Sequence, residues 1–261
     1  SVLSTWGSDV FEFPDRGPVH RRLVTTNLRF PRTVTSSSEV MADRIATVTN
    51  GRVTARVIPF GVDTVLFHPG PMPCRADRPL RFGIVKTMEA HYRIDLVIEA
   101  FAAYLAGQGA TAASLDIYGG GPLLEDLRVF AATRGISDQV TFHGAIPHAA
   151  VPQALRAMDV FLLSSETESF GVAAVEAMAC GIPVLASDAP GFVEVLDHGR
   201  YGRLYPRGDA AALTRLMAEV GGDIDVRRAL RRAGLAGASR YDWRRNVADM
   251  AELIGQTAEQ G

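Results

Sequence analysis

Cysteine is scarce in this sequence: only Cys74 and Cys180 occur among 261 residues. Disulfide scaffolds and structural zinc sites need more cysteines than this, at regular spacings. No histidine stands at a metal-ligand spacing, and we expect four of them on the surface: His20, His68, His148 and His198. The sequence therefore predicts neither a disulfide framework nor a metal site, and a reducing cytosol is the default compartment.

Long apolar runs and an excess of one charge are also lacking. No stretch approaches the roughly 20 apolar residues of a transmembrane helix, and no signal peptide is visible. The net charge is −2 and the isoelectric point is near 6.3, so the basic stripe of nucleic-acid-binding proteins is absent. The hydrophobic fraction of 47% can form a sizeable core. We expect one large α/β domain, or one domain and part of another, without a nucleic-acid partner.

From residue 80 onward, short apolar runs alternate with amphipathic stretches. Runs that are apolar at every position, such as residues 160–163, are typical of parallel strands covered on both faces. Because helical segments separate these runs, the pattern predicts a doubly wound parallel sheet in an α/β fold. The six expected strands lie at residues 81–85, 114–118, 140–143, 159–163, 184–186 and 202–205.

The first 70 residues contain shorter elements and end in a linker-like stretch. The expected elements are strands at residues 2–3, at 33–35 and from 56, and helices at 21–28 and 38–45. Ser37 or Ser38 is the expected cap of the second helix. Pro and Gly are concentrated at 69–73, where we place a domain boundary. Since residue 1 is Ser and residues 1–4 resemble the interior of a strand, we expect the chain to begin partway through a domain.

The stretch from 159 to 184 has the pattern of one strand–loop–helix–strand unit. Gly181 ends its predicted helix, and Pro183 cannot extend it. Ligands of such units bind beyond the carboxyl ends of the strands, where free N–H groups at the helix start favour an anion. Glu168 in the loop and Glu176 two turns into the helix flank that start. The pattern predicts a ligand with both phosphate and hydroxyl groups, in which the acids accept from the hydroxyls.

Several blocks of sequence together indicate a family. The most specific runs from Glu168 to Glu176, two acids with seven residues between them and a Phe-Gly pair inside. The other blocks lie at residues 58–63, 118–122, 140–144, 181–184 and 191–194. In this order they resemble the retaining nucleotide-sugar glycosyltransferases of the GT-B type, family four, also called glycosyl transferases group 1. The resemblance covers residues 57 to 205.

The resemblance implies two Rossmann-like domains, with the donor sugar nucleotide held mainly by the C-terminal one. Residues 1–70 would be the last part of the N-terminal, acceptor-binding domain, whose first part is absent. Residues 71–240 would form the donor-binding domain. Residues 241–261 would form a helix that crosses back towards the N-terminal domain.

The resemblance also assigns roles to the two acids and the segment between them. Glu168 would be catalytic, because it would contact the donor sugar and stabilise positive charge at the anomeric carbon. Glu176 would accept hydrogen bonds from the two ribose hydroxyls. The alternatives are a helix-capping acid for Glu168 and an exposed helix acid for Glu176. Backbone N–H groups would contact the donor at Ser169, Phe170, Gly171 and Val172, and the side chain of Phe170 is expected in the core.

Cations are expected where the strand at 81–85 ends. Family members place Arg or Lys at the position of Lys86, which we expect to be catalytic, and a second Lys a few residues on. Both would stabilise the leaving diphosphate in place of a divalent metal, so neither a metal nor a cofactor is expected. This sequence departs from the pattern at the second cation. The charge would come from His91 or from Arg93, which stands where Gly is usual.

Two loops have an interpretation that stays open between ligand binding and structure. Gly119 and Gly120 follow the strand at 114–118, and they either contact the donor or only form the turn. Ile146 lies in a loop, residues 143–147, that resembles the place where the base packs. Its side chain either lines the base or fills the loop.

The sequence thus predicts a retaining hexosyltransferase that moves a sugar from a nucleotide diphosphate sugar to a hydroxyl acceptor. The acceptor would be a saccharide or lipid-linked saccharide, in polysaccharide or glycolipid synthesis. We expect a cytoplasmic protein, with peripheral contact to the inner membrane face as a family-level expectation. Two alternatives remain open: a catalytically silent nucleotide-sugar-binding remnant, and a GT-B-type epimerase or phosphorylase. The acid–base residues or cofactor lysine that the second alternative needs are not visible.

Overall fold

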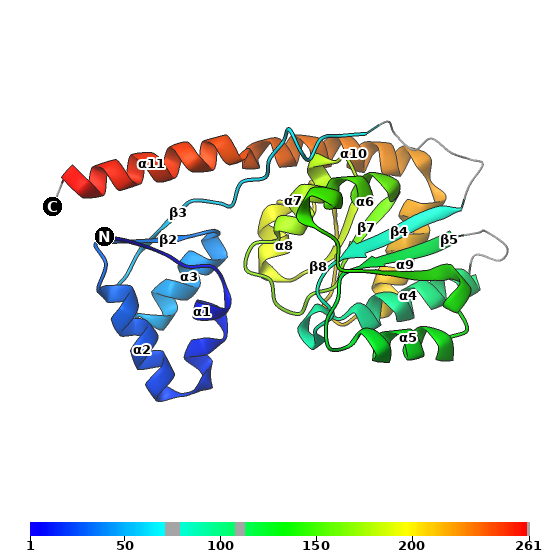
Figure 1. Cartoon of the computed structure of the whole chain (residues 1–261), viewed down its shortest axis with the longest axis horizontal. Helices are drawn as coiled ribbons and strands as arrows, with labels where there is room; N and C mark the ends of the chain where they lie inside the picture. Colours follow the sequence, from blue (N-terminus) through cyan, green and yellow to red (C-terminus); the bar gives the residue numbers. More distant parts are fainter. Residues whose placement is uncertain (71–78, 108–112, 260–261) are drawn as a thin grey trace.

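The computed structural model describes residues 1–70, 79–107 and 113–259. Two parallel sheets organise this part of the chain, each in its own lobe (Figure 1). The smaller sheet has the order β1-β2-β3, formed by Val2–Ser4, Thr33–Ser36 and Ala55–Val57. The larger sheet has six strands, so the α/β class and the doubly wound parallel sheet expected from the sequence are confirmed.

The six strands of the larger sheet begin and end within one residue of the expected positions. From β4 to β9 they are Leu80–Val85, Ala113–Tyr118, Val140–Gly144, Val160–Leu163, Val184–Ser187 and Arg203–Tyr205. Their order across the sheet is β6-β5-β4-β7-β8-β9, so the chain starts in the middle and builds the two halves in turn. The loops after β4 and β7 therefore leave from neighbouring strands, at the switch point where ligands bind in such sheets.

Helices cover both faces of this sheet, because successive side chains of a strand point to opposite faces. On β7, Val160 and Leu162 belong to one buried cluster, whereas Phe161 belongs to the other. The first cluster is completed by α4 (Ile94–Gly107), α5 (Leu124–Thr133) and α9 (Ala210–Gly222). The second is completed by α6 (Val151–Ala157), α7 (Val172–Ala179) and α8 (Pro190–Val195). α10 (Ile224–Ala238) packs against α7 and α9.

The smaller sheet packs with three helices into a separate core. They are α1 (Ser8–Phe11), α2 (Pro18–Arg29) and α3 (Glu39–Val48). The hydroxyl of Ser38 accepts from the Met41 N–H at 3.1 Å and so caps α3. Of the two caps that the sequence allowed, the structure therefore uses Ser38.

Two stretches of chain connect the lobes and run side by side. The Val62 N–H donates to the Tyr241 carbonyl at 2.7 Å, and the Trp243 N–H donates back to the Val62 carbonyl at 3.2 Å. From there α11 (Trp243–Glu259) extends along the smaller lobe (Figure 1). The domain limits 1–70, 71–240 and 241–261 stay a prediction. Residues 71–73 of the proposed boundary lie outside the described residues, as does Cys74.

Candidate active site

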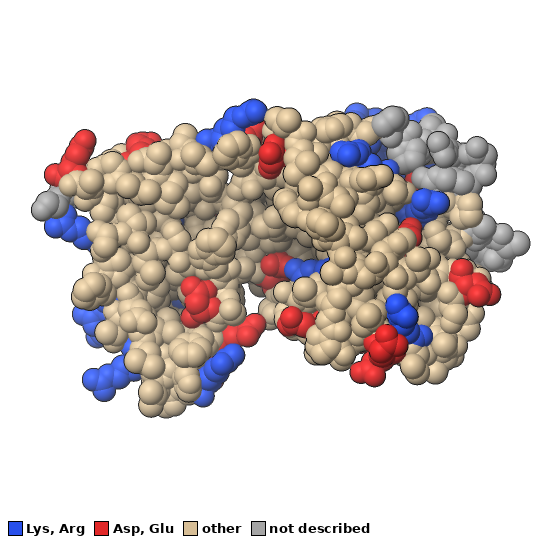
Figure 2. All heavy atoms as spheres, viewed as in Figure 1, with Lys and Arg blue, Asp and Glu red and all other residues tan. Residues whose placement is uncertain are grey.

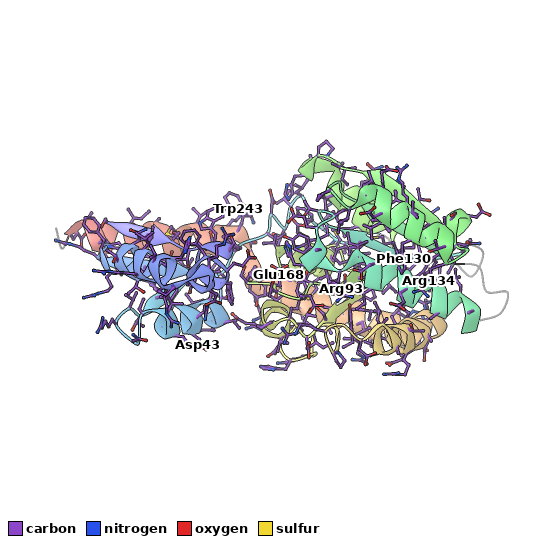
Figure 3. The ribbon with its side chains drawn as sticks, turned by 90° about the horizontal axis from the view of Figure 1, so that it is seen from below. Asp43, Arg93, Phe130, Arg134, Glu168 and Trp243 are labelled. Carbon is purple, nitrogen blue, oxygen red and sulfur yellow. The ribbon has the colours of Figure 1, made fainter. Side chains whose placement is uncertain are left out.

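The loop between β7 and α7 contains the predicted acid Glu168 and packs against α8. Gly171 adopts a φ of +103°, and a Cβ at this position would lie 2.7 Å from the Phe192 ring. The Gly191 N–H, at the start of α8, donates to the Glu168 carbonyl at 3.0 Å. Phe170 is buried in the core, as expected. These contacts fix the backbone at the point where Glu168 projects between the lobes (Figure 3).

The two residues expected to be catalytic form an ion pair. Lys86 follows β4, and its Nζ lies 3.0 Å from Oε2 of Glu168. The two side chains are only 19% and 15% exposed, so water screens their charges less than it would at the surface. The Lys86 Nζ also lies 4.1 Å from the centroid of the Tyr92 ring, a cation–π contact. The structure therefore brings Lys86 and Glu168 together and adds Tyr92, to which the sequence analysis assigned no role.

Gly119 packs closely against the backbone of Lys86. The Lys86 N–H donates to the Tyr118 carbonyl at 2.9 Å, and the Met88 N–H donates to the Gly120 carbonyl at 2.9 Å. Gly119 has a φ of +136°, and a Cβ there would overlap the Lys86 carbonyl oxygen. This close approach gives Gly119 a structural reason to be glycine. A donor contact at Gly119 or Gly120 stays a prediction.

Glu176, the second acid, is nearly enclosed and paired with a histidine. Its side chain is 11% exposed, and its Oε1 lies 2.9 Å from Nε2 of His148, whose side chain is 69% exposed. Burial raises the pKa of the Glu176 carboxyl, while the hydrogen bond from His148 and the charge of Lys86 oppose part of this rise. The surface position predicted for His148 is correct, but the sequence did not predict this contact. No spacing rule connects a loop histidine with a helix acid 28 residues later.

The two candidates for a second cation are placed differently. Arg93 has a φ of +51°, which fits a position where Gly is usual. Its guanidinium donates to Asp95 at 3.1 Å and to Glu166 at 2.6 Å, and these contacts raise the pKa of Arg93. The Nδ1 of His91 lies 3.7 Å from the Glu89 carboxylate. Arg93 therefore has two carboxylate partners within the chain, and His91 has one.

The start of α7 and Ser169 lie where the lobes meet. The first N–H groups of a helix have no acceptor within the helix, so those at Gly171 and Val172 suit an anionic ligand. The Ser169 carbonyl accepts from the Ser38 hydroxyl of the smaller lobe at 2.6 Å, and the Ser169 hydroxyl donates to the Trp6 carbonyl at 3.4 Å. Both lobes therefore hold this segment.

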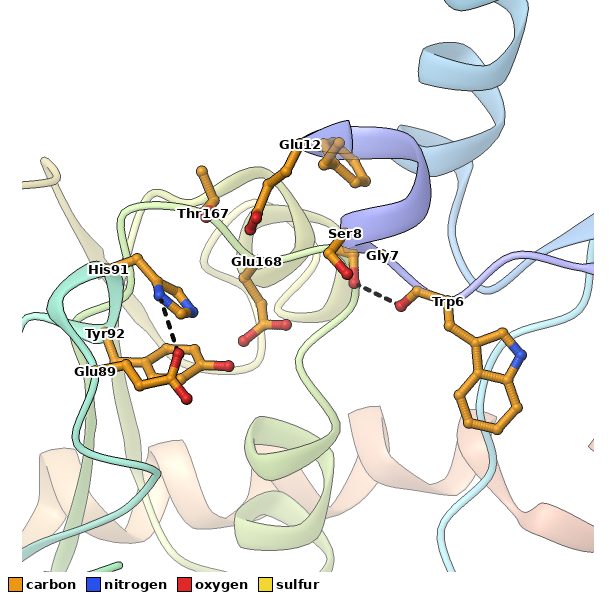
Figure 4. A pocket seen from close by; sticks show the side chains of 11 residues that line it. Trp6, Gly7, Ser8, Glu12, Glu89, His91, Tyr92, Thr167 and Glu168 are labelled. Atoms are coloured by element: carbon orange, nitrogen blue, oxygen red, sulfur yellow. Dashed lines mark hydrogen bonds and ion pairs between the residues drawn. The ribbon is translucent and has the colours of Figure 1, made fainter. Parts of the chain in front are cut away.

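A cleft of about 440 Å³ lies between the lobes, in front of Glu168. Figure 4 shows Ser8 and Glu12 of the smaller lobe opposite His91, Thr167 and Glu168 of the larger. Figure 2 shows the hollow between the lobes and charged side chains of both signs beside it. The cleft is open both to the predicted catalytic acid and to solvent.

Ile146 lies in the loop that follows β6, a strand at one edge of the larger sheet. It is half-buried and, like Tyr118, packs against the second buried cluster, which contains Phe161. Tyr118 stacks on His143 with ring centroids 4.1 Å apart, and His143 Nε2 lies 2.7 Å from Asp116. These contacts hold the loop in place. A contact between Ile146 and a base stays a prediction.

Two further findings concern the described ranges 1–70, 79–107 and 113–259. Within them, no three His, Cys, Asp or Glu side chains are placed to share a metal ion. In the same ranges, no helix combines the length and the apolar character that crossing a bilayer requires.

The fold and the two acids at the switch point define the class of protein, and comparison with known families names it. Residues 75–235 match the family described as Glycosyl transferases group 1, and the chain belongs to this family. Solved structures share its fold. HepE of Anabaena, crystallised with UDP and glucose, superposes with a TM-score of 0.84 at 22% identity, over 97% of this chain and 71% of HepE. Sucrose-phosphate synthase of Thermosynechococcus elongatus superposes with a TM-score of 0.86 at 23% identity, over 100% of this chain and 68% of the synthase.

Curated relatives are similar over part of their length. The 2-deoxystreptamine N-acetyl-D-glucosaminyltransferase of Streptomyces fradiae is 37% identical over 47% of this chain and 29% of its own length. The GDP-mannose-dependent alpha-(1-6)-phosphatidylinositol monomannoside mannosyltransferase of Mycolicibacterium smegmatis is 29% identical over 87% of this chain and 63% of its own length. The chain thus spans less than two thirds of either relative.

Proposed function

We propose that this chain carries the donor site of a retaining hexosyltransferase that uses a nucleotide diphosphate sugar. The observation that carries the proposal is the arrangement of Lys86 and Glu168 at the carboxyl ends of β4 and β7 together with Glu176 on α7. One cation and two acids converge there on the anion-favouring start of α7. Membership of the family and the nucleotide-sugar names of its relatives support this assignment.

The Lys86–Glu168 pair fits the charges that develop during sugar transfer. When the bond between the anomeric carbon and the diphosphate breaks, its electron pair leaves with the diphosphate oxygen. Positive charge then grows on the sugar and negative charge on the leaving group. Glu168 would stabilise the first and Lys86 the second, in a site where both are already positioned. The acceptor hydroxyl oxygen forms the new bond to the anomeric carbon, and its proton passes to the departing diphosphate oxygen.

The nucleotide would lie along α7. Glu176 would accept from the ribose hydroxyls, and the N–H groups at Ser169, Phe170, Gly171 and Val172 would contact the donor. Lys86 would supply the positive charge that a divalent metal supplies in other transferases. Activity without added metal therefore belongs to the proposal.

The cleft suggests which acceptors fit. Its lining includes the carboxylates of Glu12 and Glu89, and none of the described residues that line it is Lys or Arg. Such a lining favours an uncharged or amine-bearing acceptor over a phosphorylated one, because like charges repel. The relatives differ here by name, one being named for 2-deoxystreptamine and one for phosphatidylinositol monomannoside. We propose a polyhydroxylated acceptor of the uncharged or amine-bearing kind.

Turnover of nucleotide sugars tests the proposal. The chain is incubated with UDP- and GDP-sugars and with neutral, aminated and phosphorylated polyols, in the presence of EDTA. The expected result is release of nucleoside diphosphate that depends on a neutral or aminated acceptor, with the anomeric configuration of the donor kept in the product. Nucleotide binding without release would instead support the silent binding protein that the sequence left open. If the chain shows neither nucleotide binding nor release of nucleoside diphosphate, the proposal is contradicted.

A further inference from the structure

We propose that His148 is a positioning residue of the donor site, which holds the Glu176 carboxylate oriented and ionised to receive the ribose. The inference deepens the proposed function and rests on it. Neither the motif around Glu168 nor the family's sequence blocks assigned His148 a role. Its role is inferred from its contact with Glu176.

The His148 ring is anchored although it is exposed. The residue begins the short helix His148–Ala150, directly after Pro147. Its ring packs against the buried Phe67 with centroids 5.3 Å apart, and its Nε2 lies 2.9 Å from Glu176 Oε1. The ring therefore has an apolar contact and a polar contact at once. Such a histidine is held in one orientation, although water reaches most of its side chain.

Glu176 needs a partner of this kind because its surroundings are apolar. Its helix neighbours Ala174, Val175, Ala177 and Met178 are all buried. An acid in such a place favours its neutral form, and a neutral carboxyl has fewer acceptor sites for two hydroxyl groups. A donor hydrogen bond from His148 favours the ionised form instead. The pair therefore lets a buried acid keep the charge that ribose binding uses.

The charged surroundings of Glu176 leave this task mainly to His148. Lys86, from the end of β4, acts on the carboxylate through space, and the Cys180 thiol lies four residues after Glu176, at the C-cap of α7. Among the described residues, His148 is the one whose side chain is hydrogen-bonded to Glu176. Lys86 is itself paired with Glu168.

The contact does not block the carboxylate. Each carboxylate oxygen can accept two hydrogen bonds, and His148 uses one position on Oε1. Oε2 and the second position on Oε1 stay open to two hydroxyl groups. His148 can therefore support the nucleotide without competing with it.

The test is a pH series of UDP and GDP binding, measured by calorimetry on the whole chain. His148→Ala removes the hydrogen bond, His148→Gln keeps a neutral donor, and His20→Ala on α2 is the matched control. Without His148 the pKa of Glu176 should rise further. As the solution is acidified, the Glu176 carboxylate then becomes neutral at a higher pH, and nucleotide binding is lost at that higher pH. We expect the pH midpoint of this loss to lie higher in His148→Ala than in the wild-type chain, by as much as that pKa rises, and the change in affinity well above the midpoint to be small. Gln should restore most of the affinity.

Three outcomes separate the two proposals. If His148→Ala keeps the wild-type affinity and pH dependence while Glu176→Gln weakens binding, the role of His148 is refuted and the donor site stands. Tighter binding by His148→Ala would show competition with the nucleotide, which also refutes it. If the wild-type chain binds no nucleotide, the proposed function itself fails. In a Glu176→Gln background, His148→Ala should add no further loss, which a general folding defect would not reproduce.

Discussion

Lys86 Nζ and Glu168 Oε2 lie 3.0 Å apart at the ends of two neighbouring parallel strands. The sequence placed the two residues 82 positions apart, and the strand order makes them partners. Each is the counter-charge of the other. In the proposed reaction they face opposite developing charges, so the same pair that is stable at rest is suited to the transition state.

Replacing Glu168 by Gln should affect the chemical step far more than binding. Gln keeps the shape of the side chain but removes the charge that would stabilise the sugar in the transition state. We expect kcat to fall about 100-fold, while the dissociation constant for UDP or GDP changes less than about threefold. Steady-state kinetics and calorimetry on the same preparation measure both. A weaker dissociation constant with an unchanged kcat would show that Glu168 acts in binding alone.

Glu176 should show a conflict between stability and function. Because burial raises its pKa above the ordinary 4.5, the ionised carboxyl destabilises the fold. The neutral form of the carboxyl is the one that favours the folded state. Its contribution to stability is complete below pH 4.5 and is lost as pH rises through the raised pKa. Glu176→Gln should therefore melt at the same or a higher temperature at pH 7, by about 2–4 °C per kcal/mol gained, and show no gain at pH 4. The exposed Glu125→Gln on α5 is the control, and a lower melting temperature at pH 7 would contradict this sign.

Gly119→Ala should displace Lys86. The new Cβ would overlap the Lys86 carbonyl oxygen, and φ is already +136°. Gly135→Ala is a matched control, because Gly135 also has a positive φ, of +71°, but nothing lies within 4 Å of the added atom. The free energy of unfolding of the control should fall by about 1 kcal/mol because of backbone strain. That of Gly119→Ala should fall further, and this variant should also lose activity. Denaturant unfolding measures both, and equal losses would exclude the overlap as the cause.

Arg93→Gln distinguishes a structural role from a diphosphate contact. The guanidinium is already paired with Asp95 and Glu166, so we expect its loss to lower thermal stability and to change the KM for the donor less than about threefold. Lys86→Gln, by contrast, should lower kcat strongly. A large rise in KM for Arg93→Gln at unchanged stability would instead place Arg93 on the diphosphate.

Local patterns predicted the larger lobe well. Its strands are short runs with apolar residues on both faces, as in residues 160–163, and such runs identify parallel strands without further information. Ser38 before α3 and Gly181 after α7 have the residue types that helix ends need. The acid pair was found because its two members lie on one strand–loop–helix unit.

Contacts between distant segments could not be predicted in this way. The carboxylate of Glu194 accepts from the N–H groups of Glu39 and Val40 at 2.9 and 3.0 Å, across about 155 positions and between the lobes. His148 reaches Glu176 from another loop. Such contacts depend on where whole elements pack, and nothing in the neighbouring sequence announces them. The sequence therefore predicted the two acids of the candidate site but not the distant residues that support it.

The most direct test of the donor site is calorimetric titration of the chain with UDP and GDP, beside Glu176→Gln and Glu125→Gln. The proposed donor site predicts binding of at least one nucleotide without added metal, a loss of affinity of about tenfold or more in Glu176→Gln from the missing charged acceptor, and no change in Glu125→Gln. Absence of binding by the wild-type chain, or equal affinity of all three proteins, would contradict it.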